Sequence, residues 1–327
     1  MESNHEIGSY FIIGFEGQKV DSILNSFFKD FTPAGWILFS KNMQSPQQVK
    51  ELNGKLKILY ETIPPFITVD QEGGRVNRLF SKYPSGRDMT NFFFEDKEKL
   101  TKLLSNMAKD IKSLGFNTDF APVADIEFAE SEIIGDRAFS DDPYTAAQLV
   151  KLFIDIFNNE KILSSVKHFP GHGGVIIDSH KELPMDNNSI SVISQEYLPP
   201  FIEGIKATVP LVMFAHVIYT EIDEFLPASL SVKAALLLKK TGFSGLSVTD
   251  DLYMNAIKDN FSPKDIVQLL LNNHTDLWIV SKNTEFQEML RKELFDLRWK
   301  SEVKDQMFKH YRRIENFWSN VSEKIYS

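Results

Sequence analysis

LSSVKHF, residues 163–169, is a short apolar run of strand-forming residues that ends in a lysine, a histidine and a phenylalanine. Amphipathic stretches with apolar residues at helical spacing lie between this run and others like it. Near-continuous apolar strands that alternate with helices indicate a parallel sheet covered by helices. The other runs span residues 10–15, 35–40, 65–70, 116–122, 210–216, 245–250 and 276–281. Together these runs predict an α/β fold, a closed (β/α)₈ barrel (a TIM barrel) rather than a doubly wound sheet.

Several of these runs end in residue types that carry chemistry. Asp70 closes the third run, His216 the sixth and Asp250 the seventh, and Lys167 and His168 lie at the end of the fifth. The carboxyl ends of the strands of such a barrel share one mouth, where the loops between strands and helices build the active site. The sequence therefore predicts that these side chains face one another across a single site.

No change in composition and no linker rich in glycine, serine or proline divides the 327 residues. We therefore predict one barrel domain over residues 1–327. The segment from about 285 to 327 has apolar residues at helical spacing, and we expect it to form a helical tail that packs on the barrel.

Composition restricts the classes of partner. The net charge of −9 argues against nucleic-acid binding, which needs a basic face. The absence of cysteine excludes a disulfide scaffold, a thiolate zinc site and a cysteine nucleophile. No apolar run approaches the roughly 20 residues that span a bilayer, and the first residues lack a signal-peptide pattern. We expect a cytoplasmic protein, a monomer or weak homo-oligomer, that acts on a small molecule.

The motif VDQEGGRVNR, residues 69–78, places a carboxylate at a strand end before a glycine pair and two arginines. Asp70 and the two arginines, Arg75 and Arg78, are suited to holding a polar ligand. Taken alone, however, the motif is described better by a glycine turn with surface arginines.

The motif IIGDRAFSDDP, residues 133–143, precedes a predicted helix. Asp142 is predicted to be the N-cap of that helix and Pro143 its first residue. Arg137 is then the residue of this segment that is available for another role.

The motif VKHFPGHGGVIIDSH, residues 166–180, concentrates histidines after the fifth strand. A metal site is one interpretation, because four side chains are competent ligands: His168, His172, Asp178 and His180. Pro170 and Gly171 nevertheless prevent the helical spacing on which zinc-protease motifs rely. Residues two apart in an extended chain project to the same side, so Asp178 is predicted to orient His180 and to raise its basicity. Such a pair is suited to transferring protons.

The motif SVTDDLYM, residues 247–254, follows the seventh strand. Asp250 is suited to attack an anomeric carbon and to form a covalent glycosyl intermediate. The alternative interpretation, a helix N-cap, suits Asp251 better than Asp250.

Together, DQEGGRV, KHFPGHG followed by DSH, and TDD-L-M resemble the motifs of the family 3 glycoside hydrolases. More narrowly, they resemble those of the bacterial β-N-acetylglucosaminidases (β-N-acetylhexosaminidases) of peptidoglycan recycling. The motifs cover most of the chain in the family's order and spacing. The resemblance implies a retaining exo-β-N-acetylglucosaminidase that cleaves terminal β-linked N-acetylglucosamine from muropeptides such as GlcNAc-1,6-anhydro-MurNAc. It implies no cofactor and no metal.

The resemblance also implies a role for each matching residue. Asp250 matches the nucleophile, and His180 matches the acid/base that Asp178 orients. The residues that match those gripping the terminal sugar are Asp70, Arg78, Arg137, Lys167 and His168. His216 is expected to line the site, whereas Asp125 and His172 are expected to fix loop structure. The segment that contains Gly171, Gly173 and Gly174 is expected to move during turnover.

Two positions depart from the family's pattern. Residues 273–276, Asn-His-Thr-Asp, stand where the family usually has Ala-Gly before the aspartate of the last strand, and Ser140 stands where glycine is common. Both departures are expected to alter the shape of the loops around the aglycone.

Several other functions stay open. A histidine acid/base repels an incoming anion less than a carboxylate does, so a phosphorylase is one alternative. A β-glucosidase or β-xylosidase on the same barrel is another, although those relatives usually take a carboxylate acid/base from elsewhere. In a different enzyme class, Lys167 would form a Schiff base with a carbonyl substrate, as aldolases do. A metal hydrolase and a non-catalytic sugar-binding protein complete the alternatives.

Overall fold

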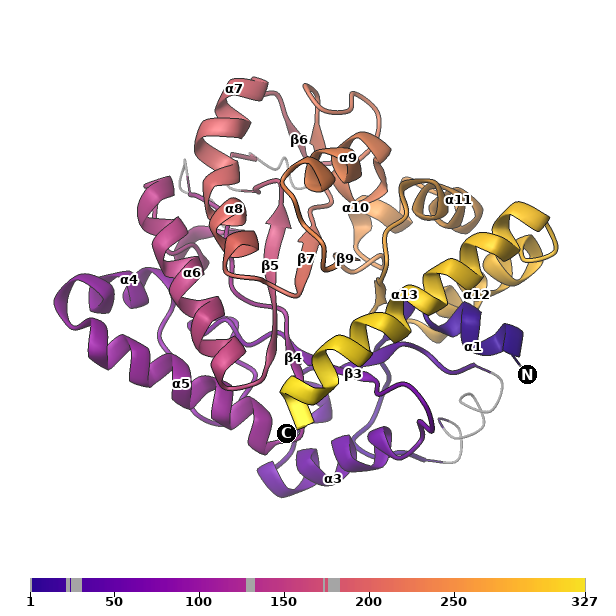
Figure 1. Ribbon diagram of the computed structural model, residues 1–327, viewed down its shortest axis with the longest axis horizontal. Helices are drawn as coiled ribbons and strands as arrows, with labels where there is room; N and C mark the ends of the chain where they lie inside the picture. The colour runs from indigo at the N-terminus through magenta and orange to yellow at the C-terminus, as the bar shows by residue number, and fades with distance from the viewer. Residues whose placement is uncertain are drawn as a thin grey trace.

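The computed structural model describes residues 2–21, 24, 31–127, 133–172, 174–175 and 183–326 (Figure 1). Its main feature is an eight-stranded parallel sheet. The strands of this sheet, in chain order, are β1 (Phe11–Ile13), β2 (Gly35–Ile37), β3 (Phe66–Val69), β4 (Thr118–Asp119), β5 (Leu163–Phe169), β7 (Leu211–Phe214), β9 (Leu246–Thr249) and β10 (Trp278–Val280).

The sheet closes on itself to form a barrel. β10 pairs with β1 in parallel, and the order then follows the chain to β9. Between the last two strands, the backbone N–H of Thr249 donates to the carbonyl of Leu277 at 2.9 Å. Each run that the sequence analysis marked contains one strand of this barrel, so the predicted (β/α)₈ fold is confirmed.

Strand residues alternate between the inside of the barrel and the surrounding helices, as the pleat of a strand requires. Phe66 and Val248 belong to an inner apolar cluster, whereas Ile67 belongs to an outer cluster shared with the helices. The same alternation continues past the ends of β3 and β9. It directs Asp70 and Asp250 toward the inner side at the carboxyl end of the barrel.

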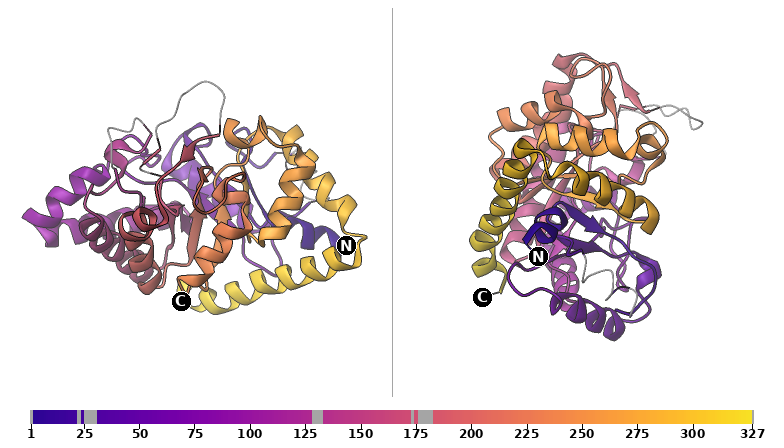
Figure 2. Two further views of the ribbon diagram at one scale, coloured as in Figure 1. Left: turned by 90° about the horizontal axis from the view of Figure 1, so that it is seen from above. Right: turned by 90° about the vertical axis from the view of Figure 1, so that its right-hand side faces the viewer.

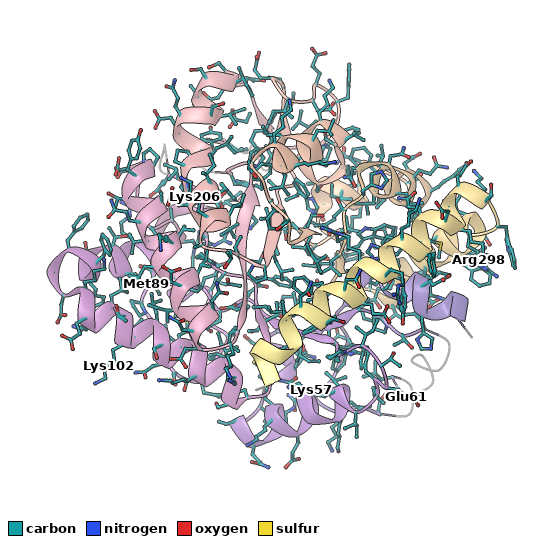
Figure 3. All side chains as sticks on the ribbon, in the orientation of Figure 1. Lys57, Glu61, Met89, Lys102, Lys206 and Arg298 are labelled. Carbon is teal, nitrogen blue, oxygen red and sulfur yellow. The ribbon has the colours of Figure 1, made fainter. Side chains whose placement is uncertain are left out.

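Helices cover the outside of the barrel. The helices in the connections after six of the strands include α3 (Pro46–Lys57), α5 (Lys97–Ser113), α6 (Pro143–Asn159), α8 (Leu198–Lys206), α9 (Val232–Lys240) and α11 (Pro263–Asn273). Other elements are α1 (Glu2–Gly8), α4 (Gly86–Glu95), α7 (Ile190–Val192), α10 (Asn255–Lys258), the 3₁₀ turns η1 (Ser40–Asn42), η2 (Gly135–Arg137) and η4 (Ala228–Leu230), and the π-helical turn η3 (Ile193–Tyr197). Lys102 projects outward from α5, whereas Met89 of α4 is buried (Figure 3).

The start of α6 agrees with the capping chemistry of its sequence. The side chain of Asp142 accepts the backbone N–H of Thr145, and Pro143 occupies the first helical position, where its missing N–H costs no hydrogen bond. The predicted N-cap and first residue are therefore confirmed.

The C-terminal segment forms α12 (Thr284–Leu297) and α13 (Ser301–Tyr326). Ile314 and Trp318 of α13 belong to the inner cluster, and the Trp318 ring lies 4.7 Å from the ring of Phe66, the first residue of β3. α13 therefore packs across the amino-terminal end of the barrel (Figures 1 and 2). Among the described helices, none is both long and apolar enough to cross a membrane.

A second, two-stranded parallel sheet joins β6 (Met185–Asp186) to β8 (Ile218–Tyr219). β6 belongs to the connection after β5, and β8 to the connection after β7. These strands were not predicted from the sequence, because two residues are too few to produce a recognisable apolar pattern.

The expected effect of residues 273–276 on the aglycone side is wrong. These residues lie before β10 and therefore at the amino-terminal end of the barrel. His274 ends α11 with a left-handed backbone (φ 58°), the conformation that glycine adopts most easily. Ser140, in contrast, precedes α6 in the connection after β4, where its hydroxyl accepts the backbone N–H of Asp142 at 3.0 Å.

Candidate active site

Asp250 directly follows β9 at the carboxyl end of the barrel, and a quarter of its side chain is exposed. One carboxylate oxygen accepts the backbone N–H of Asp251 at 2.7 Å, and the other lies 3.9 Å from Nε2 of His168. Burial disfavours the charged carboxylate, but the neighbouring histidines His168 and His216 hold the pKa of Asp250 below its ordinary value. Asp250 is therefore an ionised carboxylate with an accessible oxygen.

His168 is held by the fully buried carboxylate of Asp125. Its Nδ1 lies 2.7 Å from Asp125 Oδ2, while Asp125 Oδ1 accepts the backbone N–H groups of His168 and His172. Burial opposes ionisation of Asp125, yet the adjacent His168 lowers the pKa of this carboxyl. The carboxylate thus favours a proton on Nδ1 and turns Nε2 toward Asp250. These contacts agree with the loop-fixing role expected of Asp125.

Lys167 lies at the centre of a buried network of ion pairs. Its Nζ is 2.8 Å from Asp70 and 2.6 Å from Glu72. Arg137 binds the same Glu72 with two nitrogens, at 2.7 and 2.9 Å. Burial favours a neutral Glu72, but Lys167 and Arg137 lower its pKa to about 2. Three of the predicted sugar-binding residues (Asp70, Lys167 and Arg137) therefore belong to one network of ion pairs, which Glu72 joins.

The charge of Lys167 bears on the Schiff-base alternative. Burial disfavours the protonated amine, but Asp70 and Glu72 outweigh burial and raise the pKa of Lys167 above its ordinary value. Schiff-base formation requires a neutral amine, so this environment argues against an aldolase-type function.

Glu72 is the residue of this network that the sequence analysis missed. It lies two positions after Asp70 in the motif of residues 69–78, and both of its oxygens are occupied by cations. Its side chain is 5% exposed, which suits holding Lys167 and Arg137 in place. The sequence signal that could have identified Glu72 is a carboxylate two residues after the aspartate at the end of a strand.

The described contacts of Arg78 do not include the residues of this network. Its backbone N–H donates to the side-chain oxygen of Gln71 at 2.8 Å, which fixes the turn after Asp70. Among the described residues, no hydrogen-bond partner satisfies its buried Nε. The expected role of Arg78 in holding a polar ligand stays a prediction.

His216 contacts the backbone of the residue that follows Asp250. Its Nδ1 lies 2.7 Å from the hydroxyl of Ser229, and its Nε2 lies 3.1 Å from the carbonyl of Asp251. Only 2% of the residue is exposed, and burial lowers its pKa. With both nitrogens engaged, His216 supports the backbone that carries the carboxylate, and its expected place in the lining of the site stays a prediction.

Asp251 does not cap a helix, so the alternative interpretation of the motif of residues 247–254 is wrong. The N-cap of α10 is Met254. Asp251 instead accepts the backbone N–H and the hydroxyl of Ser281, just after β10. It therefore ties the end of β9 to the end of β10, which steadies the adjacent Asp250.

Asp178 and His180, the predicted acid/base pair, lie outside the described residues. Within the ranges that the structure describes, no group of three or more histidines and carboxylates is arranged to hold a metal ion.

The sequence and the structure of this chain are similar to those of known proteins of one family. A family model described as the glycosyl hydrolase family 3 N-terminal domain matches residues 7–314. A β-hexosaminidase of Xylella fastidiosa (strain M23) is 33% identical over 256 residues, which cover 76% of each chain. A β-hexosaminidase of Nitrosospira multiformis is 32% identical over 300 residues, 88% of this chain and 84% of that protein. The structure of a family 3 β-N-acetylglucosaminidase from Paenibacillus sp. str. FPU-7 matches 97% of this chain with a TM-score of 0.88 and 28% identity, and this chain spans 62% of that structure. The chain therefore belongs to glycoside hydrolase family 3 and is a glycoside hydrolase.

Proposed function

We propose that this enzyme is a retaining exo-β-N-acetylglucosaminidase that removes terminal β-linked N-acetylglucosamine from glycans. The observation that carries the proposal is the ionised, accessible carboxylate of Asp250, 3.9 Å from His168 at the carboxyl end of the barrel. A carboxylate in this state is a competent nucleophile toward an anomeric carbon.

In the first step, an oxygen of Asp250 bonds to the anomeric carbon while the bond to the leaving oxygen breaks. His180, oriented by Asp178, gives its proton to that oxygen. In the second step, water attacks the anomeric carbon, the bond to Asp250 breaks, and His180 takes the proton from the water. The two displacements together retain the configuration at the anomeric carbon.

Asp70, Lys167 and Arg137 are proposed to bind the hydroxyls of the terminal sugar. An ammonium group and a guanidinium group donate hydrogen bonds, whereas the Asp70 carboxylate accepts them. Because Asp70 and Glu72 together balance the charges of Lys167 and Arg137, the network presents both kinds of group with little net charge. Such a surface suits an uncharged sugar better than an anionic one.

The names of the relatives support the proposed substrate class. The curated relatives are β-hexosaminidases, and the Paenibacillus structure is a β-N-acetylglucosaminidase. We extend the proposal to N-acetylglucosaminyl muropeptides as natural substrates, including GlcNAc-1,6-anhydro-MurNAc, and to a cytoplasmic role in peptidoglycan recycling.

A panel of aryl glycosides tests the proposal. We expect rapid cleavage of the β-N-acetylglucosaminide, little cleavage of the β-glucoside and β-xyloside, and no dependence on added phosphate. Cleavage that requires phosphate and yields a sugar phosphate would identify a phosphorylase. Preferred cleavage of the glucoside or xyloside would reject the proposed specificity.

The His180→Ala variant tests the proposed acid. We expect a larger loss of activity with sugar leaving groups than with activated phenols, which need little protonation. Equal losses with both would show that another group is the acid.

A further inference from the structure

Arg75 is one of the two arginines that follow the glycine pair of the DQEGGRV motif, and the proposed function gives it no role. Its guanidinium reaches the connection after β4 and contacts three residues that directly precede Arg137. Nη2 donates to the backbone carbonyls of Ile133 and Ile134, the second at 3.1 Å. Nε lies 3.3 Å from a carboxylate oxygen of Asp136. Arg75 thus joins two connections at the carboxyl end of the barrel.

A tight turn directly after Glu72 presents the Arg75 side chain. The backbone N–H of Val76 donates to the carbonyl of Gly73 at 3.0 Å, and the N–H of Glu72 donates to the carbonyl of Val76 at 3.0 Å. Gly73 and Gly74 have positive φ angles (93° and 55°), which glycine adopts most easily. Glu72 and Arg75 therefore belong to the same hydrogen-bonded turn.

This turn holds Arg137 at two places. Glu72 binds the guanidinium of Arg137 through both carboxylate oxygens, at 2.7 and 2.9 Å. Arg75 binds the backbone from which Arg137 extends. The carbonyl oxygen of Ile133 accepts from Arg75 and also from Nη1 of Arg137 at 3.1 Å. One carbonyl oxygen therefore links the two guanidinium groups, and a shift of this backbone would move Arg137 relative to Glu72.

The bonds of Arg75 to the two carbonyls matter more than its ion pair with Asp136. Both side chains of that pair are about half exposed (45% and 52%), and ion pairs exposed to solvent stabilise a protein little. A charged donor forms a stronger hydrogen bond with a carbonyl than a neutral donor does. Arginine suits this place, because its planar guanidinium presents several N–H groups in a fixed geometry.

We propose that Arg75 is a positioning residue that sets the place of Arg137 in the sugar-binding network, and this inference rests on the proposed function. Glu72 fixes the guanidinium end of Arg137, whereas Arg75 fixes the backbone end. Without Arg75, the guanidinium of Arg137 is less well aligned with a sugar hydroxyl. Arg137 is proposed to hold the sugar and takes no part in bond breaking, so the loss appears in KM rather than in kcat.

The test compares Arg75→Met with Arg87→Met. Arg87 is the matched control, because its side chain is 42% exposed and it also joins the connection after β3 to the connection after β4, through an ion pair with Glu127. For an aryl β-N-acetylglucosaminide, we expect Arg75→Met to raise KM about tenfold and to change kcat about twofold or less. Arg87→Met is expected to leave both constants nearly unchanged. Equal rises of KM in the two variants, or no rise in Arg75→Met, would overturn the inference.

A double-variant cycle separates positioning from a general loss of stability. If Arg75 acts through Arg137, then adding Arg75→Met to an Arg137→Met enzyme raises KM further by about twofold or less, because the group that Arg75 positions is already gone. A further rise of about tenfold in that enzyme would show that Arg75 acts on the sugar by another route. That result would overturn the inference.

Hydrogen exchange measures the positioning without activity. The backbone N–H of Arg137 donates to the carbonyl of Ile134 at 3.0 Å, within the segment that Arg75 holds. We expect this amide to exchange faster in Arg75→Met than in the wild type, and at the wild-type rate in Arg87→Met. Unchanged exchange in Arg75→Met would overturn the inference. A wild-type enzyme that cleaves no N-acetylglucosaminide would instead reject the proposed function, and the exchange rates would still show whether Arg75 holds this segment.

Discussion

Nε2 of His168 lies 3.9 Å from the carboxylate of Asp250, while Nδ1 of the same ring lies 2.7 Å from Asp125. The imidazole thus links a buried carboxylate to an accessible one. Asp125 also accepts the backbone N–H groups of His168 and His172, so it fixes the position of the ring as well as its tautomer. The charge state of Asp250 depends on this arrangement, because His168 lowers its pKa.

The Asp125→Asn variant tests this link. The amide would present a donor to Nδ1, which favours a neutral ring protonated on Nε2. We expect kcat/KM to fall about 10- to 100-fold, as when a group that orients a functional histidine is removed. An unchanged kcat/KM in a folded Asp125→Asn variant would contradict the link.

Glu72→Gln tests the buried network. The substitution keeps the shape of the side chain but leaves Lys167 and Arg137 without a shared anion. Breaking a buried ion pair from one side typically costs about 3–5 kcal/mol, so we expect a clear loss of stability in urea unfolding, together with a raised KM. Asp155→Asn is the control, because it breaks an exposed pair with Lys151 on α6 and is expected to change stability little. Equal losses of stability in Glu72→Gln and Asp155→Asn would contradict the role of Glu72 in holding the buried network together.

The pH dependence of stability is predicted to involve His310 of α13, whose ring stacks on Tyr10 at 3.6 Å. Burial lowers the pKa of His310 from 6.5 to about 4, although Asp276 opposes this shift. Between pH 4 and 6.5, His310 therefore binds a proton more readily in the unfolded chain than in the folded chain. The stability due to the neutral ring is complete above pH 6.5, and roughly 3 kcal/mol is lost as the pH falls to 4 and below.

We expect His310→Phe, which retains an aromatic ring against Tyr10, to reduce the pH dependence of unfolding between pH 6.5 and 4. The control is His274→Asn, because His274 is exposed and asparagine tolerates its left-handed backbone. Urea unfolding at a series of pH values measures the slope. A slope as steep in His310→Phe as in the wild type would show that other groups cause the acid sensitivity.

The barrel was predictable because its signal is long and repeated. Each buried strand appears as an apolar run, and the helices between them have apolar residues at helical spacing. The strand ends were predictable for the same reason, since a period of two carries Asp70 and Asp250 to the inner face. β6 and β8 lack such a signal because their pairing depends on tertiary contacts between two loops.

Lys167 and His168 show what the period of two does not predict. Adjacent strand residues ordinarily face opposite sides, yet Lys167 contacts Asp70 and His168 lies near Asp250. The register of β5 against β7 shifts between Val166 and Phe169. Irregular pairing of this kind redirects side chains. The prediction that both residues serve the same site came from their place at a strand end, and the period of two did not support it.

His216 and Glu72 show the limit of assigning roles by residue type. A histidine at a strand end and a carboxylate near a glycine pair look equally functional in sequence. The hydrogen bonds of the folded chain separate them: His216 contacts the carbonyl of Asp251, and Glu72 binds the two cations Lys167 and Arg137. Neither partner is close in sequence.

The central claim is that Asp250 forms a covalent bond with the sugar. The most direct measurement is mass spectrometry of the enzyme after reaction with a 5-fluoro-N-acetylglucosaminyl fluoride, followed by peptide mapping. We predict one added sugar per chain on the peptide that contains Asp250, and none in a folded Asp250→Ala variant that has lost hydrolysis. A label on another residue, or wild-type hydrolysis by Asp250→Ala, would contradict the claim.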